Sequence, residues 1–168
     1  MNRHLPNKSL IVFIIVTAVV LLDQATKAGI ASKMLLYDSS IIIEGLLNLT
    51  YVRNPGAAFG FLSHASPVFR SAFFILITVS AIGLIFYYIA MSKENEACLI
   101  FALSLILGGA VGNLIDRVRF GEVVDFIDVY WRTYHWPAFN VADAAISLGA
   151  LIMVFETLRR KKKNVEAP

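Results

Sequence analysis

Four long apolar runs dominate the pattern of hydrophobic and polar positions along the chain. The first, Leu10–Leu22, is interrupted only by Thr17, and its pattern continues past Asp23 to Ile30. A helix that crosses a bilayer needs about 20 mostly apolar residues. The pattern therefore predicts four membrane-spanning helices, over approximately 10–30, 71–91, 97–115 and 141–158.

The first apolar run also has a second interpretation, because Arg3, His4 and Lys8 precede it as basic residues precede the core of a cleaved signal peptide. A cleavage site with small residues in an A-x-A pattern does not follow, and Asp23 and Gln24 stand there instead. We therefore expect an uncleaved membrane anchor.

The segments between the predicted helices, 31–70 and 116–140, are too long to be simple turns. Ser40–Tyr51 (SIIIEGLLNLTY) is rich in β-branched and apolar residues with a break at Gly45, which predicts two short strands or a small sheet lying on the membrane. Asn-Pro-Gly at 54–56 predicts a turn. The expected fold is an all-α integral membrane protein of one domain, 1–168, with a small β-sheet platform outside the membrane.

Composition and charge agree with a membrane protein and suggest its orientation. The chain is 58% hydrophobic and 16% charged, with a mean hydropathy of +0.70, whereas soluble domains are about 25% charged. The net charge of +3 is too mild to indicate nucleic-acid binding. Lys and Arg are denser in 1–9, 92–96 and 159–168 than in the other polar segments, which predicts that both termini are cytoplasmic.

The motifs of several common hydrolase classes are missing from the sequence. It has no H-E-x-x-H, and its three histidines are scattered, which argues against a zinc hydrolase. It also has no G-x-S-x-G and no glycine-rich phosphate loop. We therefore expect no metal and no cofactor, and carboxylates remain as the candidate catalytic groups.

Asp143 stands at the start of the last apolar run and has two interpretations. Asn140 is a good helix N-cap, which would place Asp143 where a carboxylate meets free backbone amides. Ionisable groups at membrane depth, however, are rare and usually functional. The local sequence leaves both roles equally open.

Asp125 favours the functional interpretation of Asp143. It lies in the apolar stretch GEVVDFIDVYW (121–131), and the aromatic residues that follow it favour a membrane interface. The two aspartates can therefore lie at similar depth near the outer surface. Two carboxylates held close in a poorly solvated site share a proton, so that one acts as a base and the other as an acid. The spacing permits such a pair without demonstrating it.

Five motifs together resemble the lipoprotein signal peptidase (signal peptidase II) family. They are DQATK (23–27), NPGAAFGF (54–61), GGAVGNLIDR (108–117), GEVVDF (121–126) and FNVADAAI (139–146), in the order and spacing of the family. The resemblance implies a bacterial inner-membrane aspartic endopeptidase that cuts diacylglyceryl-modified prolipoproteins on the N-terminal side of the lipidated cysteine. It also implies that the outer loop forms a β-sheet platform, and that cyclic peptide antibiotics such as globomycin inhibit the enzyme.

The same resemblance assigns the site residues. Asp125 and Asp143 fall at the catalytic positions of the family motifs. The other polar motif positions are expected to line the substrate site, and they are Asn54, Asn113, Arg117, Asn140, Asp23 and Lys27.

Some alternatives remain open from the residues alone. Arg117 could hold a substrate carbonyl or lipid ester oxygens, or it could form a salt bridge with its neighbour Asp116. Ala144 stands where many family members have serine. The chain could instead be a small proton-coupled carrier that uses Asp143, although it shows no internal repeat. A non-catalytic assembly factor is a third possibility, and the expected assembly state is a monomer.

Overall fold

The computed structural model describes residues 7–56, 62, 65–94 and 96–166, with side chains up to residue 159. Four of its helices are long and apolar enough to cross a membrane, which confirms the predicted fold class. Residues 57–61 of the NPGAAFGF motif, Arg3, and the side chains of the basic tail from Arg160 onward lie outside this description. The helices are α1 (Lys8–Lys33), α2 (Pro67–Met91), α3 (Ala97–Phe120) and α4 (Val141–Glu166).

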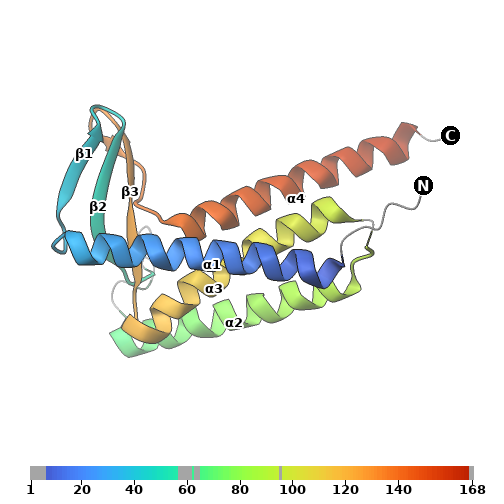
Figure 1. The fold of residues 1–168 in the computed structure, drawn as a ribbon, viewed down its shortest axis with the longest axis horizontal. Helices are drawn as coiled ribbons and strands as arrows, with labels where there is room; N and C mark the ends of the chain where they lie inside the picture. Colours follow the sequence, from blue (N-terminus) through green and yellow to red (C-terminus); the bar gives the residue numbers. More distant parts are fainter. Residues whose placement is uncertain (1–6, 57–61, 63–64, 95, 167–168) are drawn as a thin grey trace.

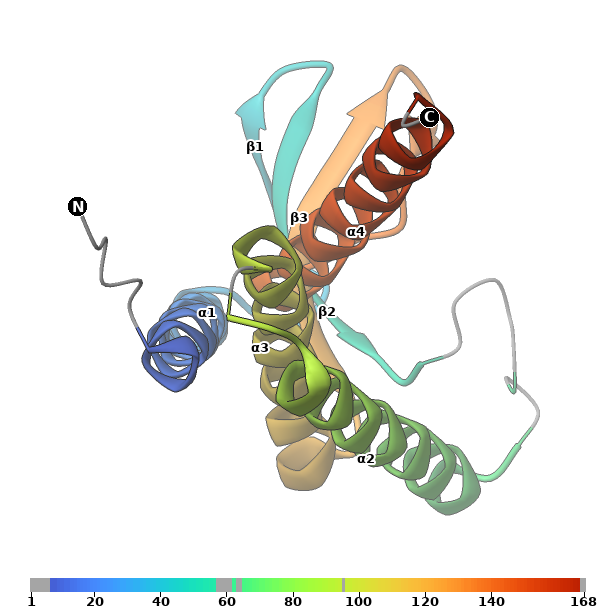
Figure 2. The same ribbon diagram turned by 90° about the vertical axis from the view of Figure 1, so that its right-hand side faces the viewer.

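Helix α3 is the centre of the bundle. It packs against each of the other three helices, and Figure 2 shows α1, α2 and α4 arranged around it. The apolar window of α3 is 61% buried, against 6% for α1 and for α2. Its buried side chains form a core with neighbours from α1 and α2, made of Val12, Ile89, Ile100, Leu103 and Leu107.

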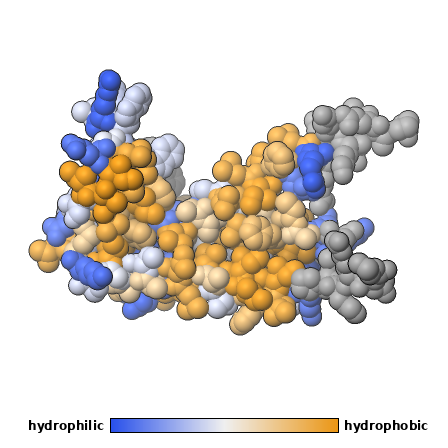
Figure 3. All heavy atoms as spheres, turned by 45° about the horizontal axis from the view of Figure 1, so that its top comes forward, coloured by the Kyte–Doolittle hydropathy of each residue, from blue (hydrophilic) through white to orange (hydrophobic). Residues whose placement is uncertain are grey.

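The outer faces of the helices are apolar and have no protein cover. Phe13 and Leu21 of α1, Leu76 of α2 and Phe155 of α4 each expose more than half of their surface. Figure 3 shows apolar residues extending broadly over the helices, with polar residues gathered towards the ends. A soluble protein rarely leaves so large an apolar surface open, so we assign this surface to lipid.

A four-stranded antiparallel sheet lies at one end of the bundle, where α1 ends and α4 begins (Figure 1). The two predicted strands are confirmed as β1 (Ser39–Ile43) and β2 (Leu47–Asn54), joined at Gly45, whose φ is 76°. The other two strands, β3 (Val123–Trp131) and β4 (Tyr134–His135), come from the second outer segment. The strand order is β1-β2-β3-β4.

The third helix is longer than the apolar pattern predicted. It continues beyond residue 115 to Phe120 and ends at Gly121, which has a φ of 75° and donates its backbone N–H to the Arg117 carbonyl. Glycine adopts this left-handed conformation without the steric cost that other residues meet. The extra turns keep Asp116 and Arg117 on a rigid helix rather than on a loop.

Candidate active site

Asp125 lies on β3, on the face of the strand that Asn54 shares. In the antiparallel pairing of β2 with β3, Val52 lies opposite Asp125 and Asn54 lies opposite Val123. Residues two apart on a strand point to the same face, so Asn54 and Asp125 are diagonal neighbours. The Asn54 amide donates a 2.8 Å hydrogen bond to Oδ2 of Asp125.

The chain turn after β2 fixes the orientation of Asn54. Its side-chain oxygen accepts a 2.8 Å hydrogen bond from the backbone N–H of Gly56. Gly56 has a φ of 88°, and a Cβ at this position would collide with the ring of Phe74. Only glycine fits here, so the Asn-Pro-Gly sequence holds the asparagine that contacts Asp125.

Asp143 occupies the first turn of α4, and its local geometry agrees with the helix-cap interpretation. The side-chain oxygen of Asn140 accepts from the backbone N–H of Asp143 at 2.9 Å. In return, Oδ2 of Asp143 accepts from the backbone N–H of Asn140 at 3.3 Å. This reciprocal capping box fixes the carboxylate at the helix end that carries the positive dipole.

Asn140 also connects the two aspartates. Its side-chain nitrogen donates to Oδ1 of Asp125 at 2.6 Å, while its backbone N–H binds Asp143. Asn140 is completely buried and Asp125 is 1% exposed, whereas Asp143 is half-buried. The structure therefore brings the two carboxylates together around one asparagine.

The environment of Asp125 favours its protonated form. Burial and, to a smaller extent, the negative charge of Asp143 raise the pKa of Asp125 to about 7. The hydrogen bonds from Asn54 and Asn140 act in the opposite direction. A carboxyl group whose pKa lies near neutrality can exchange a proton during a reaction at physiological pH.

Asn113 of α3 links Asp143 to a buried positive charge. Its amide nitrogen donates to Oδ1 of Asp143 at 2.7 Å. Its oxygen accepts from the Lys27 ammonium at 3.0 Å and from the Asn140 side chain at 3.2 Å. Six of the predicted site residues, Asn54, Asp125, Asn140, Asp143, Asn113 and Lys27, are thus joined in one hydrogen-bond network.

The Lys27 ammonium lies between two buried carboxylates, at 2.9 Å from Asp23 and 2.9 Å from Asp116. Asp23 and Lys27 are 0% and 3% exposed, so they have almost no surface to offer a substrate. They were expected to line the substrate site, but their charged atoms contact protein groups instead.

Each of these two carboxylates also holds a backbone amide next to a candidate catalytic residue. Oδ1 of Asp23 accepts from the N–H of Ala142, which directly precedes Asp143. Oδ2 of Asp116 accepts from the N–H of Val124, which directly precedes Asp125. We call Asp23, Lys27 and Asp116 the buried ion cluster, and it contacts the chain beside both aspartates.

Arg117 lies near the two aspartates and does not form the salt bridge with Asp116 that the sequence left open. Asp116 pairs with Lys27, and among the residues that the structure describes no ion pair joins it to Arg117. The Arg117 guanidinium instead lies 5.3 Å from the centre of the Phe74 ring, within electrostatic range of Asp125 and Asp143. Its charge therefore remains available to a ligand.

Sequence reasoning missed the roles of Asp116 and Gln24. The Gln24 side chain donates to Asp116 at 3.0 Å and to Asp23 at 3.1 Å, so it connects the two carboxylates of the buried ion cluster. The i, i+4 spacing of Asp23 and Lys27 on a helix was a usable signal for an ion pair. The partners on α3 could not be found in this way, because they depend on how α1 packs against α3.

Comparison with known proteins identifies the family. The family described as Signal peptidase (SPase) II matches residues 15–159. The chain is 50% identical to the lipoprotein signal peptidase of Syntrophus aciditrophicus over 158 residues, covering 94% of this chain and 98% of that protein. It is 49% identical to the lipoprotein signal peptidase of Geobacter sulfurreducens, covering 89% and 92%.

The chain belongs to the signal peptidase II family. Two solved structures of bacterial membrane enzymes agree with this assignment. One has a TM-score of 0.79 at 37% identity and covers 88% of this chain and 92% of its own. The other has a TM-score of 0.82 at 36% identity and covers 94% and 93%.

Membership of the signal peptidase II family makes the chain a membrane peptidase of the aspartic class, as the motifs predicted. The carrier that was left open from the residues alone is not favoured. Within the described part of the chain, no group of three or more His, Cys, Asp or Glu residues could hold a metal ion.

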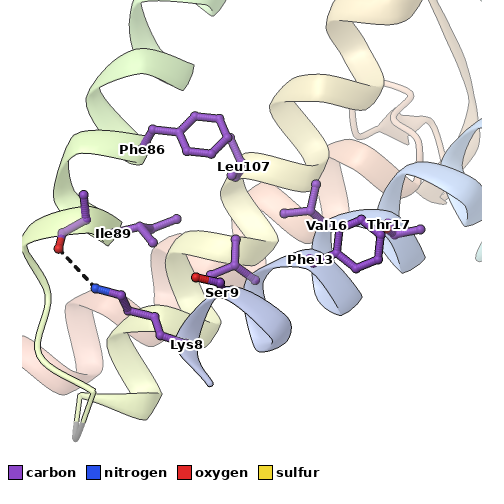
Figure 4. A pocket seen from close by; sticks show the side chains of 10 residues that line it. Lys8, Ser9, Phe13, Val16, Thr17, Phe86, Ile89 and Leu107 are labelled. Atoms are coloured by element: carbon purple, nitrogen blue, oxygen red, sulfur yellow. Dashed lines mark hydrogen bonds between the residues drawn. The ribbon is translucent and has the colours of Figure 1, made fainter. Parts of the chain in front are cut away.

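A large cavity is distant from the two aspartates of this peptidase. It measures about 510 Å³ and lies between α1, α2 and α3 at the end of the bundle opposite the sheet (Figure 4). Its walls are mostly apolar, and the Lys8 ammonium at its edge donates to the carbonyls of Ala90 and Ser92. These carbonyls end α2, so Lys8 stabilises a helix terminus.

Proposed function

We propose that Asp125 and Asp143 are the catalytic pair of a peptidase that removes signal peptides from diacylglyceryl-modified prolipoproteins. The observation that carries this proposal is the shared contact of both carboxylates with Asn140. Cleavage on the N-terminal side of the lipidated cysteine is the reaction that the resemblance implies.

The two aspartates differ in solvent access, which supports separate roles. Asp125 is buried and has a pKa near 7, so it can carry the proton of the pair and donate it to the scissile carbonyl oxygen. Asp143 is half-buried and can take a proton from the attacking water. The resulting tetrahedral diol collapses when the peptide C–N bond breaks, the leaving nitrogen receives a proton from the Asp143 carboxyl, and one diol hydroxyl returns its proton to the Asp125 carboxylate as the carbonyl re-forms.

The surrounding polar residues support this chemistry in two ways. Asn54, Asn113 and Asn140 orient the carboxylates through the hydrogen bonds described above. Arg117 is the group best placed to bind a substrate carbonyl or lipid ester oxygen, because its charge has no partner in the buried ion cluster.

The fold supports a site at the outer face of the bacterial inner membrane, with both termini in the cytoplasm. Helix α1 begins and α4 ends at the same end of the bundle, while the sheet and both aspartates lie at the other end (Figure 1). A lipid-modified substrate could then enter sideways from the bilayer, and water could enter from the sheet side. The polar network is complete within one chain, which supports a monomer. Occupation of this site by a cyclic peptide antibiotic such as globomycin would exclude the substrate.

Purified protein in detergent tests the proposal with a diacylglyceryl-modified precursor. Asp125→Asn and Asp143→Asn should each reduce cleavage by on the order of a thousandfold, because each removes a group that transfers a proton. Asp128→Asn is the matched control, since Asp128 lies on the same strand and pairs with His135. Full cleavage by either catalytic variant would refute the pair. Activity that disappears in a metal chelator would indicate a metal instead.

A further inference from the structure

A second cavity, of about 330 Å³, lies beneath the sheet between the outer ends of α1 and α3. Gln24 and Ser32 of α1, Arg119 and Phe120 of α3, and Arg53 and Val124 of the sheet are among its lining residues. We call this cavity the arginine pocket.

The arginine pocket is on the opposite face of the sheet from the two aspartates. Arg53 lies opposite Val124 in the β2–β3 pairing, whereas Val52 lies opposite Asp125. Because successive residues of a strand point to opposite faces, Arg53 and Asp125 point away from each other. The pocket therefore opens away from the two aspartates, and Lys27 and Asp116 of the buried ion cluster lie in its lining between it and the proposed catalytic site.

Two guanidinium groups converge on one ring in this pocket. The Cζ atoms of Arg53 and Arg119 lie 4.4 Å and 4.9 Å from the centre of the Phe120 ring. Among the described residues, neither arginine is in an ion pair with a carboxylate. The acid in the pocket lining, Asp116, is already bound to Lys27 at 2.9 Å. The uncompensated charge of the two arginines therefore favours an anion in the pocket.

One of these arginines is held in a fixed orientation. The Tyr51 hydroxyl accepts from Nε of Arg53 at 3.1 Å and from Nη2 at 2.8 Å. This contact fixes the guanidinium plane and leaves Nη1 for a ligand. A planar guanidinium with free N–H groups binds phosphate oxygens strongly and with defined geometry.

The position of the pocket indicates where the phosphate comes from. Its α1 wall includes Ala28, and Leu21 lies two helical turns deeper in the membrane on the same side of that helix. Leu21 is 65% exposed and apolar, as is Val118 beside the α3 wall at 67%. An anion bound at this level would adjoin lipid-facing surface, which matches a phospholipid whose chains continue along the helices. Basic pockets between membrane helices bind lipid head groups on the cytoplasmic side of membranes, and the same charge attraction applies to a pocket at the opposite end of the helices.

We propose that the arginine pocket binds the phosphate group of an anionic phospholipid from the leaflet beside the sheet. The full-length protein, delipidated in a neutral detergent, would be titrated with phosphatidylglycerol and with phosphatidylcholine of the same acyl chains, and binding would be read by native mass spectrometry. Phosphatidylglycerol should bind more tightly. The double variant Arg53→Gln/Arg119→Gln should bind it on the order of 30-fold more weakly, because each arginine near an anionic lipid contributes roughly fivefold.

Arg132→Gln is the matched control, because Arg132 stacks on Trp131 at 5.5 Å in the β3–β4 turn and is remote from the pocket. An equal loss in this control, or equal binding of the two lipids, would overturn the proposal. Full displacement of the lipid by excess inorganic phosphate would also overturn it, since the pocket would then be a site for small anions.

Two further measurements separate this proposal from others. The melting temperature of the double variant should match that of the wild type, which distinguishes lost binding from lost folding. If the double glutamine variant proves unstable, two other variants replace it. Arg53→Lys/Arg119→Lys keeps both charges and should keep the preference for phosphatidylglycerol. The single Arg119→Gln variant should bind phosphatidylglycerol more weakly than the wild type. Asp125→Asn should bind lipid normally, so failure of the catalytic proposal would not affect this one.

Discussion

The side-chain nitrogen of Asn140 lies 2.6 Å from Oδ1 of Asp125 on a different element of the fold. The same residue caps α4 and binds Asp143 through its backbone N–H. One buried asparagine therefore sets the position of a helix and the contact between a helix and a strand. The structural and functional interpretations of Asp143 are compatible, because the cap is what holds the carboxylate beside its partner.

Replacement of Asn140 should affect stability and activity together. In Asn140→Ala the lost cap should cost about 1 kcal/mol. The loss of the side-chain hydrogen bond that orients Asp125 should reduce cleavage by roughly 2- to 10-fold. The measurements are thermal unfolding in detergent and the rate of precursor cleavage.

Asn48→Ala is the control for this variant. Asn48 donates to Asp128 at 2.9 Å, so the substitution also removes an asparagine–aspartate bond between strands. It should leave the cleavage rate unchanged. An Asn140→Ala protein that cleaves at the wild-type rate would contradict the proposed role of Asn140.

The raised pKa of Asp125 predicts how activity depends on pH. With a pKa of about 7 in the folded protein, Asp125 loses its proton as the pH rises through neutrality. Cleavage that needs this proton should therefore fall above about pH 7. A cleavage rate that stays constant from pH 6 to roughly pH 9 would rule out Asp125 as the essential acid.

The free energy of unfolding should also depend on the protonation of Asp125, in a direction that its raised pKa defines. Because the pKa of Asp125 is higher in the folded than in the unfolded chain, the folded state binds more protons between the two values. Stability is therefore fully present at pH below the unfolded value of 3.8 and is lost as the pH rises towards about 7. Each pH unit in this window costs at most about 1.4 kcal/mol. Asp125→Asn has no carboxyl group to titrate and should not lose stability in this way. The melting temperature of the variant minus that of the wild type should therefore be larger at pH 8 than at pH 5.

Removal of the Lys27 charge should displace both aspartates. In Lys27→Met, Asp23 and Asp116 lose their shared cation, and breaking a buried ion pair by deleting one partner costs about 3–5 kcal/mol. Since these carboxylates hold the amides of Ala142 and Val124, cleavage should fall even where the variant remains folded. Urea unfolding and cleavage kinetics at low temperature measure the two effects.

The control for Lys27→Met is Lys33→Met. Lys33 is exposed in the last turn of the same helix. Its loss should change stability by less than about 0.5 kcal/mol and leave cleavage unchanged. If both lysine variants behaved alike, the buried ion cluster would have no positioning role.

The sequence predicted the membrane helices and the first two strands because their signals are local. Apolar length identifies a membrane helix, and Ser40–Tyr51 carries β-branched residues around a glycine turn. The third strand was not predicted. Val123, Val124, Asp125 and Phe126 are all buried, so neither face of this part of the strand is exposed and the alternation typical of a half-buried strand is missing.

The polar site was only partly predictable for a related reason. Asn140 and Asp143 lie three residues apart, and their capping box follows from the local sequence. Asn113 and Lys27 are separated by 86 residues, and only the packing of α1 against α3 brings them together. The resemblance to a family supplied Asn113 as a site residue, but it did not reveal that Lys27 is buried behind it.

Gly112 provides a test of that helix packing. A Cβ added at Gly112 would lie 2.7 Å from Oδ2 of Asp23, closer than nonbonded atoms approach, and Asp23 has little room to move because it is bound to Lys27. Gly112→Ala should therefore separate α1 from α3, destabilise the protein by about 1–3 kcal/mol and slow cleavage.

Gly83→Ala on α2 is the matched control, since nothing lies within 4 Å of its added Cβ, and alanine favours the helix by roughly 0.5–1 kcal/mol. Opposite shifts in melting temperature for the two variants would support the close approach of α1 and α3. Equal shifts would mean that the backbone gives way at Gly112 and that the buried ion cluster tolerates more movement than its contacts suggest.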